Sequence, residues 1–428
     1  MLFVFQILFI IGFVALSPWY LTKMFRRGNF VRGFWQRFGI YSAAIHARAA
    51  AGGFVWIQAC SVGETRVALQ LIDQLRRRWP QMPIALTTTT LTGQTLAAKL
   101  APPEVLVFYF PLDFCLCARG ALRLLRPQLL MMIETEVWPT LVLMARRRGI
   151  PVALVNGRMS AKSFRGYRAI GPLGRSMFGA LDLVCAQGPL DEERYLQIGV
   201  RRESLRVTGS MKFDEAQRPA SNAAQARQFL DACGADPSRP VWVCGSTFAG
   251  EEEIVFRVFH ELRKKFPALF LVVAPRHPER TKEVVAVAQR CGVNLALRTE
   301  PPRAGVDAVL VNTTGELKAF YEAATVIFVG KSLRGCGGQN IIEAAATGAP
   351  VLFGPAMQNF EAVAETFVGA VGAVQVRDED GLRAALEDLL AKPERRSEIV
   401  VRARQVIAQS SGATGRTVEA IAALLRQS

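Results

Sequence analysis

Apolar runs of strand length alternate with helical stretches along almost the whole chain, and this alternation limits the fold more than any other feature of the sequence. In the first half the runs occupy residues 54–59, 84–90, 104–110, 129–134, 152–156, 183–187 and 205–208. Stretches with helical spacing, such as 66–79 and 91–100, lie between most of them. Repeated strand–helix–strand units build a parallel sheet covered by helices. The first half is therefore predicted to be an α/β domain.

The alternation stops near residue 210 and starts again near residue 241. New apolar runs follow at residues 241–245, 268–274, 293–297, 308–312, 326–330, 350–353 and 373–376. A chain of 428 residues is long for one domain, and two of about 200 residues are the natural expectation. We predict an N-terminal domain at 23–210, a linker at 211–240 and a C-terminal domain at 241–428, whose last helix can return to the first domain. Two doubly wound domains of this kind bind a ligand between facing strand ends.

Basic residues are concentrated in the first half of the chain. Residues 1–210 contain 26 Lys and Arg against 11 Asp and Glu, whereas the remainder contains 26 against 25. A basic half indicates an anionic partner: a nucleic acid, a membrane surface or a phosphorylated substrate. The eight cysteines and three histidines have no metal-ligand spacing, so we expect reduced cytosolic thiols and no metal site.

The N-terminal segment selects among these partners. Residues 2–17 are almost wholly apolar, and Trp19, Tyr20 and then several basic residues follow them. A secretory signal peptide carries its charges before the apolar run, not after it. Since a full span needs about 20 residues, we expect residues 1–22 to form a short membrane anchor that spans the bilayer or lies in its interface. A buried core helix is the alternative. Basic residues after the anchor place the domains on the cytoplasmic side and favour a membrane lipid over nucleic acid.

Glu64 is the first acidic residue of the chain and follows the strand at 54–59, in the stretch Ala59-Cys60-Ser61-Val62-Gly63-Glu64. Open parallel sheets carry their chemistry at such strand-to-helix turns. The carboxylate can be a general base, or only a helix-start acid favoured by the helix dipole. In either role we expect the helix N-terminus to keep it ionised near neutral pH.

Two more carboxylates, Glu134 and Glu136, come at the end of the apolar strand at 129–133. Buried carboxylates are costly without a partner, so either they face a cleft or one of them caps the next helix. Candidate partners for their charge are Arg158 and Lys212, the latter in the predicted linker. The basic residues between 158 and 175 suit phosphate or lipid headgroups.

Polar loops follow three strands of the second half. Arg276, after the strand at 268–274, can reach a base or phosphate, or can be a surface ion-pair residue. A second loop contains residues 313–316. A glycine-rich stretch at 335–338 opens a helix whose backbone N–H groups favour an anion, unless it is only a tight turn. One turn into that helix, Glu343 can accept hydrogen bonds from sugar hydroxyls. Together the three loops predict a nucleotide site.

The motifs ACSVGE, ETEVWP, NGRMS, GSMKFD, APRHPER and GGQNIIEA, in this order, resemble those of the 3-deoxy-D-manno-oct-2-ulosonic acid (Kdo) transferases of lipid A biosynthesis. The resemblance covers nearly the whole chain. It implies the two-domain GT-B glycosyltransferase fold, with Rossmann-like domains facing a central cleft, at the cytoplasmic face of the inner membrane. It also implies inverting, metal-independent transfer of Kdo to lipid IVA, a tetra-acylated, phosphorylated glucosamine disaccharide. CMP-Kdo is then the donor substrate, and no cofactor is required.

The resemblance also assigns roles to individual residues. Glu64 matches the family's proton acceptor, and Glu134 and Lys212 match residues that stabilise the transition state. Contacts to CMP fall on three segments, which contain Pro275, Arg276, Thr314, Gly315, Glu316, Asn340, Ile341, Ile342 and Glu343. Gln339, Ala344 and Thr314 stand where His, Pro and Met are common in the family.

Two rival functions use the same residues. A different GT-B enzyme would take a UDP-sugar to a membrane lipid acceptor or epimerise a nucleotide sugar. A non-catalytic, membrane-anchored module would bind anionic lipid or nucleic acid, but it would not need polar loops at the strand ends of two sheets. No motif specifies the number of Kdo units added or the oligomeric state.

Overall fold

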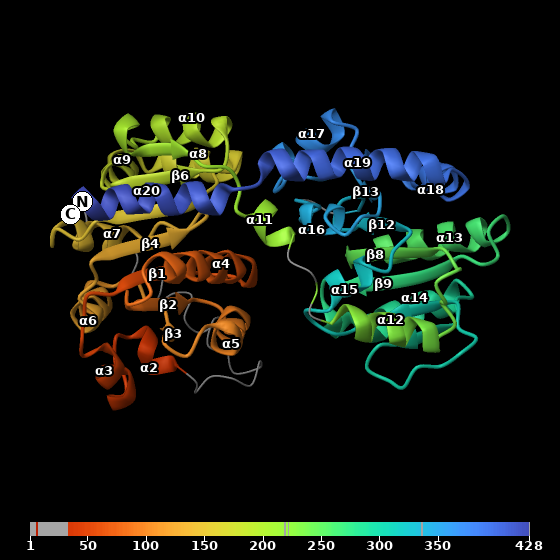
Figure 1. Ribbon diagram of the computed structural model, residues 1–428, viewed down its shortest axis with the longest axis horizontal. Coiled ribbons are helices and arrows are strands. Elements are labelled where there is room, and N and C mark those ends of the chain that lie inside the picture. Colours follow the sequence, from red (N-terminus) through yellow and green to blue (C-terminus); the bar gives the residue numbers. More distant parts are fainter. Residues whose placement is uncertain (1–5, 7–32, 218–219, 221, 335–336, 428) are drawn as a thin grey trace. The chain divides into compact units, whose positions relative to one another are not determined.

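The computed structural model describes residue 6 and residues 33–217, 220, 222–334 and 337–427 (Figure 1). The chain forms two compact units, one of Met1–Met211 with Gly412–Ser428 and one of Lys212–Ser411. The predicted anchor, residues 1–22, lies outside the described residues except for Gln6. Among the helices that the structure describes, none is long and apolar enough to cross a bilayer.

The first unit is built on a seven-stranded sheet in the order β3-β2-β1-β4-β5-β6-β7, in which all neighbours are parallel. The order reverses between β1 and β4, so their carboxyl ends form the switch point where such sheets bind ligands. All seven apolar runs predicted in the first half are strands. They are β1 (Val55–Ala59), β2 (Ile84–Thr88), β3 (Leu106–Tyr109), β4 (Leu129–Ile133), β5 (Val152–Gly157), β6 (Leu183–Ala186) and β7 (Leu205–Val207).

The central strand β4 shows why these runs are continuously apolar. Leu130 and Met132 pack into the hydrophobic cluster on one face of the sheet, and Leu129, Met131 and Ile133 pack into the cluster on the other. A parallel strand covered by helices on both faces needs apolar side chains at every position.

Helices cover the first sheet, and some of them begin with a side-chain N-cap. Ser61 and Thr90, for example, accept hydrogen bonds from the first turns of α4 and α5. The helices are α2 (Phe34–Arg37), α3 (Ala43–Ala49), α4 (Val62–Arg78), α5 (Leu91–Leu100), α6 (Cys115–Leu125), α7 (Pro139–Arg146), α8 (Ala161–Ala169), α9 (Gly171–Gly179), α10 (Pro189–Gln197), the short 3-10 helix η1 (Arg202–Ser204) and α20 (Ala413–Gln427).

The last helix, α20, belongs to the first unit although 200 residues of the second unit precede it. Figure 1 shows it in blue alongside α4 and β6. Val418 and Ile421 join the core cluster that contains β1, and the Gln70 side chain of α4 hydrogen-bonds to Thr414.

The second unit has a seven-stranded parallel sheet of its own, in the order β10-β11-β9-β8-β12-β13-β14. Its switch point lies between β8 and β12. The seven apolar runs predicted in this half are also strands. They are β8 (Val241–Thr247), β9 (Phe270–Pro275), β10 (Leu295–Leu297), β11 (Ala308–Leu310), β12 (Val326–Val329), β13 (Val351–Phe353) and β14 (Val374–Gln375).

Part of the range predicted as a linker, 211–240, forms helices of the second unit. Phe213 on α11 and Phe229 and Leu230 on α12 are buried in its core. The helices of this unit are α11 (Lys212–Ala216), α12 (Ala223–Ala232), α13 (Glu251–Arg263), the 3-10 helix η2 (Pro278–Arg280), α14 (Thr281–Arg290), α15 (Leu317–Tyr321), α16 (Ile342–Ala345), α17 (Glu361–Gly369), α18 (Glu379–Ala391) and α19 (Pro393–Ser410).

Candidate active site

Glu64 lies in the first turn of α4, directly beyond the carboxyl end of β1. Its carboxylate accepts a hydrogen bond from the Cys60 backbone N–H at 2.6 Å and another from the Ser61 hydroxyl at 3.0 Å. Ser61 is also the N-cap of the helix, which resembles a capping box. Because both carboxylate oxygens are held and the side chain is only 8% exposed, Glu64 has a fixed orientation.

Burial raises the pKa of Glu64 to about 7, although the Cys60 N–H lowers it and the charges of Glu134 and Glu136 raise it further. The prediction that the helix N-terminus keeps this carboxylate fully ionised at neutral pH is therefore wrong, because desolvation outweighs the helix dipole. A carboxylate that is about half ionised at pH 7 is well matched to accept a proton.

Glu134 follows β4, the strand that pairs with β1, so the sheet brings Glu134 and Glu64 to the same switch point. Its backbone is left-handed, with φ 63°, and so is that of Asn156 on the next strand, with φ 55°. The side-chain NH2 group of Asn156 donates to the Glu134 carboxylate at 3.4 Å. The side-chain carbonyl of Asn156 accepts from the Met211 N–H at 2.9 Å. Left-handed residues other than glycine cost about 1–3 kcal/mol each and cluster at functional sites.

Neither Glu134 nor Glu136 caps the next helix, α7. The buried carboxylate of Asp113, from the loop before α6, accepts instead from the Thr140 and Leu141 N–H groups, both at 2.9 Å. Burial raises the pKa of Asp113 to about 6, against the lowering effect of those hydrogen bonds. Sequence reasoning missed this cap because it lies 27 residues from Thr140 and no local pattern links the two.

Glu136 is the third carboxylate of the switch point. It is half-buried, and this burial raises its pKa above the ordinary range. Burial is the largest cause that raises the pKa of the Cys60 thiol to about 12, and the charge of Glu136 is the next largest. The first unit therefore gathers Glu64, Glu134 and Glu136 around the turn after β1.

Lys212 is the first residue of α11 and belongs to the second unit, whereas Glu64 and Glu134 belong to the first. Its ammonium group lies 5.5 Å from the centre of the Phe360 ring, within the range of a cation–π contact.

Pro275 is the last residue of β9, and Arg276 follows it at the carboxyl edge of the second sheet. Pro275 is in register with Thr247 of β8, and the Arg276 N–H donates to the Thr247 carbonyl at 2.9 Å. The Arg276 side chain is exposed. Arg280 of the same motif has a structural role, since its guanidinium pairs with the buried Glu252 at 2.8 Å.

The loop after β11 contains Thr314, Gly315 and Glu316. Gly315 has φ 90°, a conformation that favours glycine. The Glu316 carboxylate accepts from Arg298 at 2.9 Å and from the hydroxyl of Thr313. These bonds fix the Glu316 side chain in the loop that follows β11.

The segment from Asn340 to Glu343 leads into α16, which is a single turn rather than a long helix. Ile341 and Ile342 are fully buried, so only their backbone groups can contact a ligand. The Asn340 side chain accepts from the Ile342 N–H at 3.1 Å. Glu343 lies near Tyr321, whose pKa is raised mainly by burial and then by the Glu343 charge.

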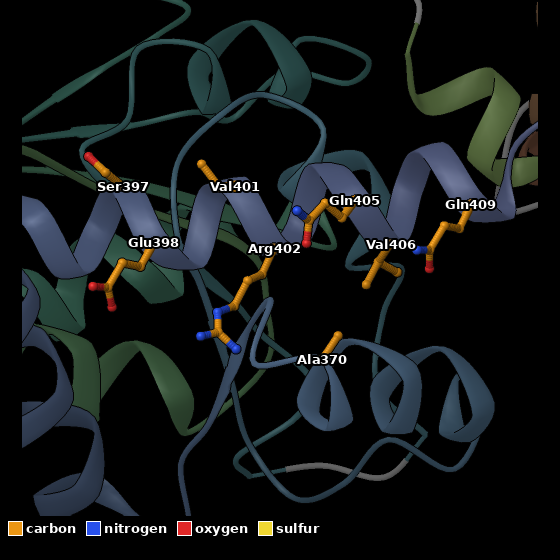
Figure 2. A pocket seen from close by; sticks show the side chains of 8 residues that line it. All are labelled: Ala370, Ser397, Glu398, Val401, Arg402, Gln405, Val406 and Gln409. Carbon is orange, nitrogen blue, oxygen red and sulfur yellow. The ribbon is translucent and has the colours of Figure 1, made fainter.

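A surface groove of about 680 Å³ runs between α17 and α19 of the second unit (Figure 2). Its lining includes Val401, Arg402 and Gln405, and none of its lining residues is a predicted site residue. The predicted residues lie instead at the carboxyl edges of the two sheets.

Comparison with protein families matches residues 32–215 to the family described as 3-deoxy-D-manno-octulosonic-acid transferase (kdotransferase). A protein of that name from Bordetella pertussis is 35% identical over 426 residues, which cover 95% of this chain and 96% of the relative. Another from Haemophilus influenzae is 30% identical and covers 90% of this chain and 89% of the relative.

Solved structures of other proteins share the fold. A UDP-GlcNAc 2-epimerase from Neisseria meningitidis, bound to UDP-GlcNAc, has a TM-score of 0.62 and covers 86% of this chain and 99% of its own. An S. aureus MnaA–UDP structure has a TM-score of 0.60 and covers 87% and 97%. At identities of 15% and 16% these likenesses concern the fold alone, which is of the two-domain GT-B type.

Proposed function

The chain belongs to the 3-deoxy-D-manno-octulosonic acid (Kdo) transferase family, and on that premise we propose that it transfers Kdo from CMP-Kdo to lipid IVA. The transfer is inverting and needs no metal. The observation that carries the proposal is the Glu64 carboxylate, which is buried, fixed by two hydrogen bonds and tuned to a pKa of about 7.

Glu64 acts as the general base. An inverting transfer requires a base that takes the proton of the acceptor hydroxyl while the nucleotide leaves from the opposite face of the sugar. A carboxylate with a pKa near 7 is ionised often enough to accept that proton and is basic enough to hold it. The hydrogen bonds from Cys60 and Ser61 leave the remaining lone pairs of its oxygens for the acceptor.

Glu134 and Lys212 stabilise the charges that develop in the transition state. The sugar gains oxocarbenium character and the CMP phosphate gains negative charge as their bond breaks. A carboxylate such as Glu134 stabilises the cationic ring, and an ammonium such as Lys212 stabilises the departing phosphate. The left-handed backbone at Glu134 supports this role, because such strain persists where a side chain must be aimed.

The second unit binds the CMP part of the donor. Arg276 offers an exposed guanidinium for the phosphate. Backbone groups at Pro275, Thr314 and Gly315 and the Glu316 side chain, fixed by Arg298, line the same sheet edge. Asn340 and Glu343, with the backbone of Ile341 and Ile342, contact the nucleoside. The one-turn length of α16 makes its dipole small, so the phosphate depends on Arg276 more than on that helix.

A cytoplasmic site at the inner membrane, next to the predicted anchor at 1–22, brings this enzyme to its acceptor. Trp35, Ile40 and Leu116 are exposed by 63%, 57% and 82%, and the backbone of Gly39 packs against that of α6. Arg119 and Arg123 follow Leu116 on one face of α6, at spacings of three and seven residues. Apolar and basic side chains on one face suit an anionic lipid surface.

Substitution Leu116→Glu should weaken sedimentation with anionic vesicles; equal sedimentation would refute this role of the face.

The test is incubation of the purified protein with CMP-Kdo and lipid IVA, followed by mass spectrometry of the lipid. A mass increase by one or more Kdo units supports the proposal, and the number of units is read from the same spectrum. Product only with UDP-sugars would identify another GT-B transferase. Lipid binding without any product, by wild-type and Glu64→Gln protein alike, would identify a non-catalytic module.

A further inference from the structure

Glu251 is the first residue of α13, beyond the carboxyl end of β8, and its side chain is fully buried. Its carboxylate is saturated with backbone hydrogen bonds from two segments. One oxygen, Oε2, accepts from the N–H groups of Phe248 at 2.9 Å and Lys331 at 2.6 Å. The other, Oε1, accepts from those of Ser332 at 3.0 Å, Leu333 at 2.8 Å and Arg334 at 3.3 Å.

Consecutive backbone N–H groups that converge on one anion form a nest. Lys331, with φ 56°, has the left-handed conformation that such a turn uses. The approach is so close that Gly330 has no space for a side chain, since a Cβ there would lie 2.8 Å from the Glu251 carboxylate. In this protein the anion in the nest is the chain's own carboxylate, so the nest shapes the 331–334 segment rather than binding a ligand.

The same segment is fixed from its other side by Ser332. The Ser332 hydroxyl accepts from the Gly354 N–H at 2.8 Å, and the Ser332 carbonyl accepts from the Ala356 N–H at 2.8 Å. The Lys331 carbonyl accepts from the Gly338 N–H at 3.2 Å, which ties the 331–334 segment to the residues just before Asn340. Asn340 follows Gly338 by two residues, so the position of the clamped segment sets where the stretch from Asn340 to Glu343 begins.

We infer that Glu251 is a positioning residue for the nucleotide site: it clamps the 331–334 backbone and thereby holds Asn340–Glu343 at the edge of the second sheet. The identity of the nucleotide as CMP rests on the proposed function, whereas the clamp does not. Glu251 contacts no ligand in this reading, because backbone groups already surround both of its oxygens.

The variant Glu251→Gln tests the clamp with almost no change of shape. Each carboxylate oxygen faces only N–H donors, so the Gln amide nitrogen opposes at least two donors in either orientation. A buried donor left without an acceptor weakens the arrangement by about 10- to 100-fold. We therefore expect the Kd for CMP and the KM for CMP-Kdo to rise by about that factor, with an unchanged KM for the lipid acceptor.

Hydrogen exchange of the backbone amides at 331–334 gives a readout independent of activity, and it should accelerate in Glu251→Gln. The matched control is Glu253→Gln, in the same turn of α13, whose half-exposed side chain pairs with Arg257 on the surface. This control should leave CMP affinity and amide exchange unchanged.

Two results would overturn the inference: faster amide exchange with CMP affinity unaltered, or unaltered exchange at 331–334. If Glu251→Gln does not fold, Ser332→Ala loosens the same segment from its other side and is judged by the same two measurements. Wild-type protein that binds a different nucleotide in place of CMP would refute the proposed donor, and the clamp would then be tested with that nucleotide.

Discussion

Replacement of Glu64 by Gln removes the proposed base without disturbing its surroundings. The Gln carbonyl can accept from the Cys60 N–H as the carboxylate does at 2.6 Å. The Ser61 hydroxyl, which donates to the other carboxylate oxygen at 3.0 Å, can rotate and accept from the Gln amide. We therefore expect Glu64→Gln to fold and to bind CMP and lipid IVA with the affinity of the wild type.

Turnover should fall by about 10²- to 10⁴-fold, the usual contribution of a positioned general base. In the wild type, kcat/KM should rise about tenfold per pH unit below pH 7 and level off above it, because only the ionised carboxylate accepts the proton. The residual activity of Glu64→Gln should lack this dependence.

The same pKa predicts a stability difference of definite sign. Folding raises the pKa of Glu64 from its ordinary 4.5 to about 7, so the folded protein binds this proton more tightly than the unfolded chain. The stabilisation that the tightly bound proton gives the folded protein is fully present below pH 4.5 and is lost as the pH rises through 7. Gln does not ionise, so at pH 8 the variant should be more stable than the wild type by up to about 3 kcal/mol. Near pH 4 the difference should vanish.

Turnover is measured at saturating CMP-Kdo and lipid IVA. The pH profile of kcat/KM is measured with lipid IVA below saturation between about pH 5.5 and 8.5, a range in which a pKa of 7 is resolved. Stability is measured by urea unfolding at about pH 4 and pH 8, on either side of the titration. Glu104→Gln is the control, because Glu104 is an exposed residue of the same unit that pairs with Arg76 on the surface. Turnover of Glu64→Gln within about tenfold of the wild type would mean that another group accepts the proton. A flat pH profile with unchanged stability would refute the raised pKa.

Other substitutions test neighbouring features. Glu136→Gln removes a charge that raises the pKa of Glu64. The acid limb of the pH–rate profile should therefore lie at lower pH in this variant than in the wild type. Asp113→Asn leaves one of the two N–H groups at the start of α7 without an acceptor, because the Asn NH2 group faces it. Urea unfolding should show a loss of about 1–3 kcal/mol. Arg280→Met leaves the carboxylate of Glu252 buried without its cation, and the same measurement should show a loss of about 3–5 kcal/mol.

The fold was predictable because its signal is local. Each strand is a short apolar run, so the positions of the fourteen strands in the described part of the chain follow from the sequence. The strand order within each sheet does not follow from such local patterns. β11 lies between β10 and β9, and this depends on packing between residues far apart in the chain, which periodicity does not encode.

The site was predictable only as far as strand ends could be located. The sequence placed Glu64 and Glu134 each at the carboxyl end of a strand, and the pairing of β1 with β4 brings these two strand ends side by side. It did not indicate the pKa of Glu64, because burial depends on the whole fold. It also missed Asp113 and Glu251, whose partners lie 27 and about 80 residues away and are backbone N–H groups with no sequence signature.

The two sheets have the same two features at their switch points, left-handed residues other than glycine and buried carboxylates. Neither feature can be predicted from local sequence patterns. Each sheet has left-handed residues other than glycine at or just beyond the carboxyl ends of neighbouring strands: Glu134 and Asn156 in the first unit, Ser246 and Lys331 in the second. Each also buries carboxylates against backbone N–H groups nearby, at a cost in stability that local propensity would avoid. Such costs persist only where the surrounding contacts enforce a geometry, and in proteins they cluster at functional sites. Four of the left-handed residues other than glycine in the described part of the chain, Glu134, Asn156, Ser246 and Lys331, therefore lie at the same two sheet edges as the motifs, whereas Arg126 and Val371 do not.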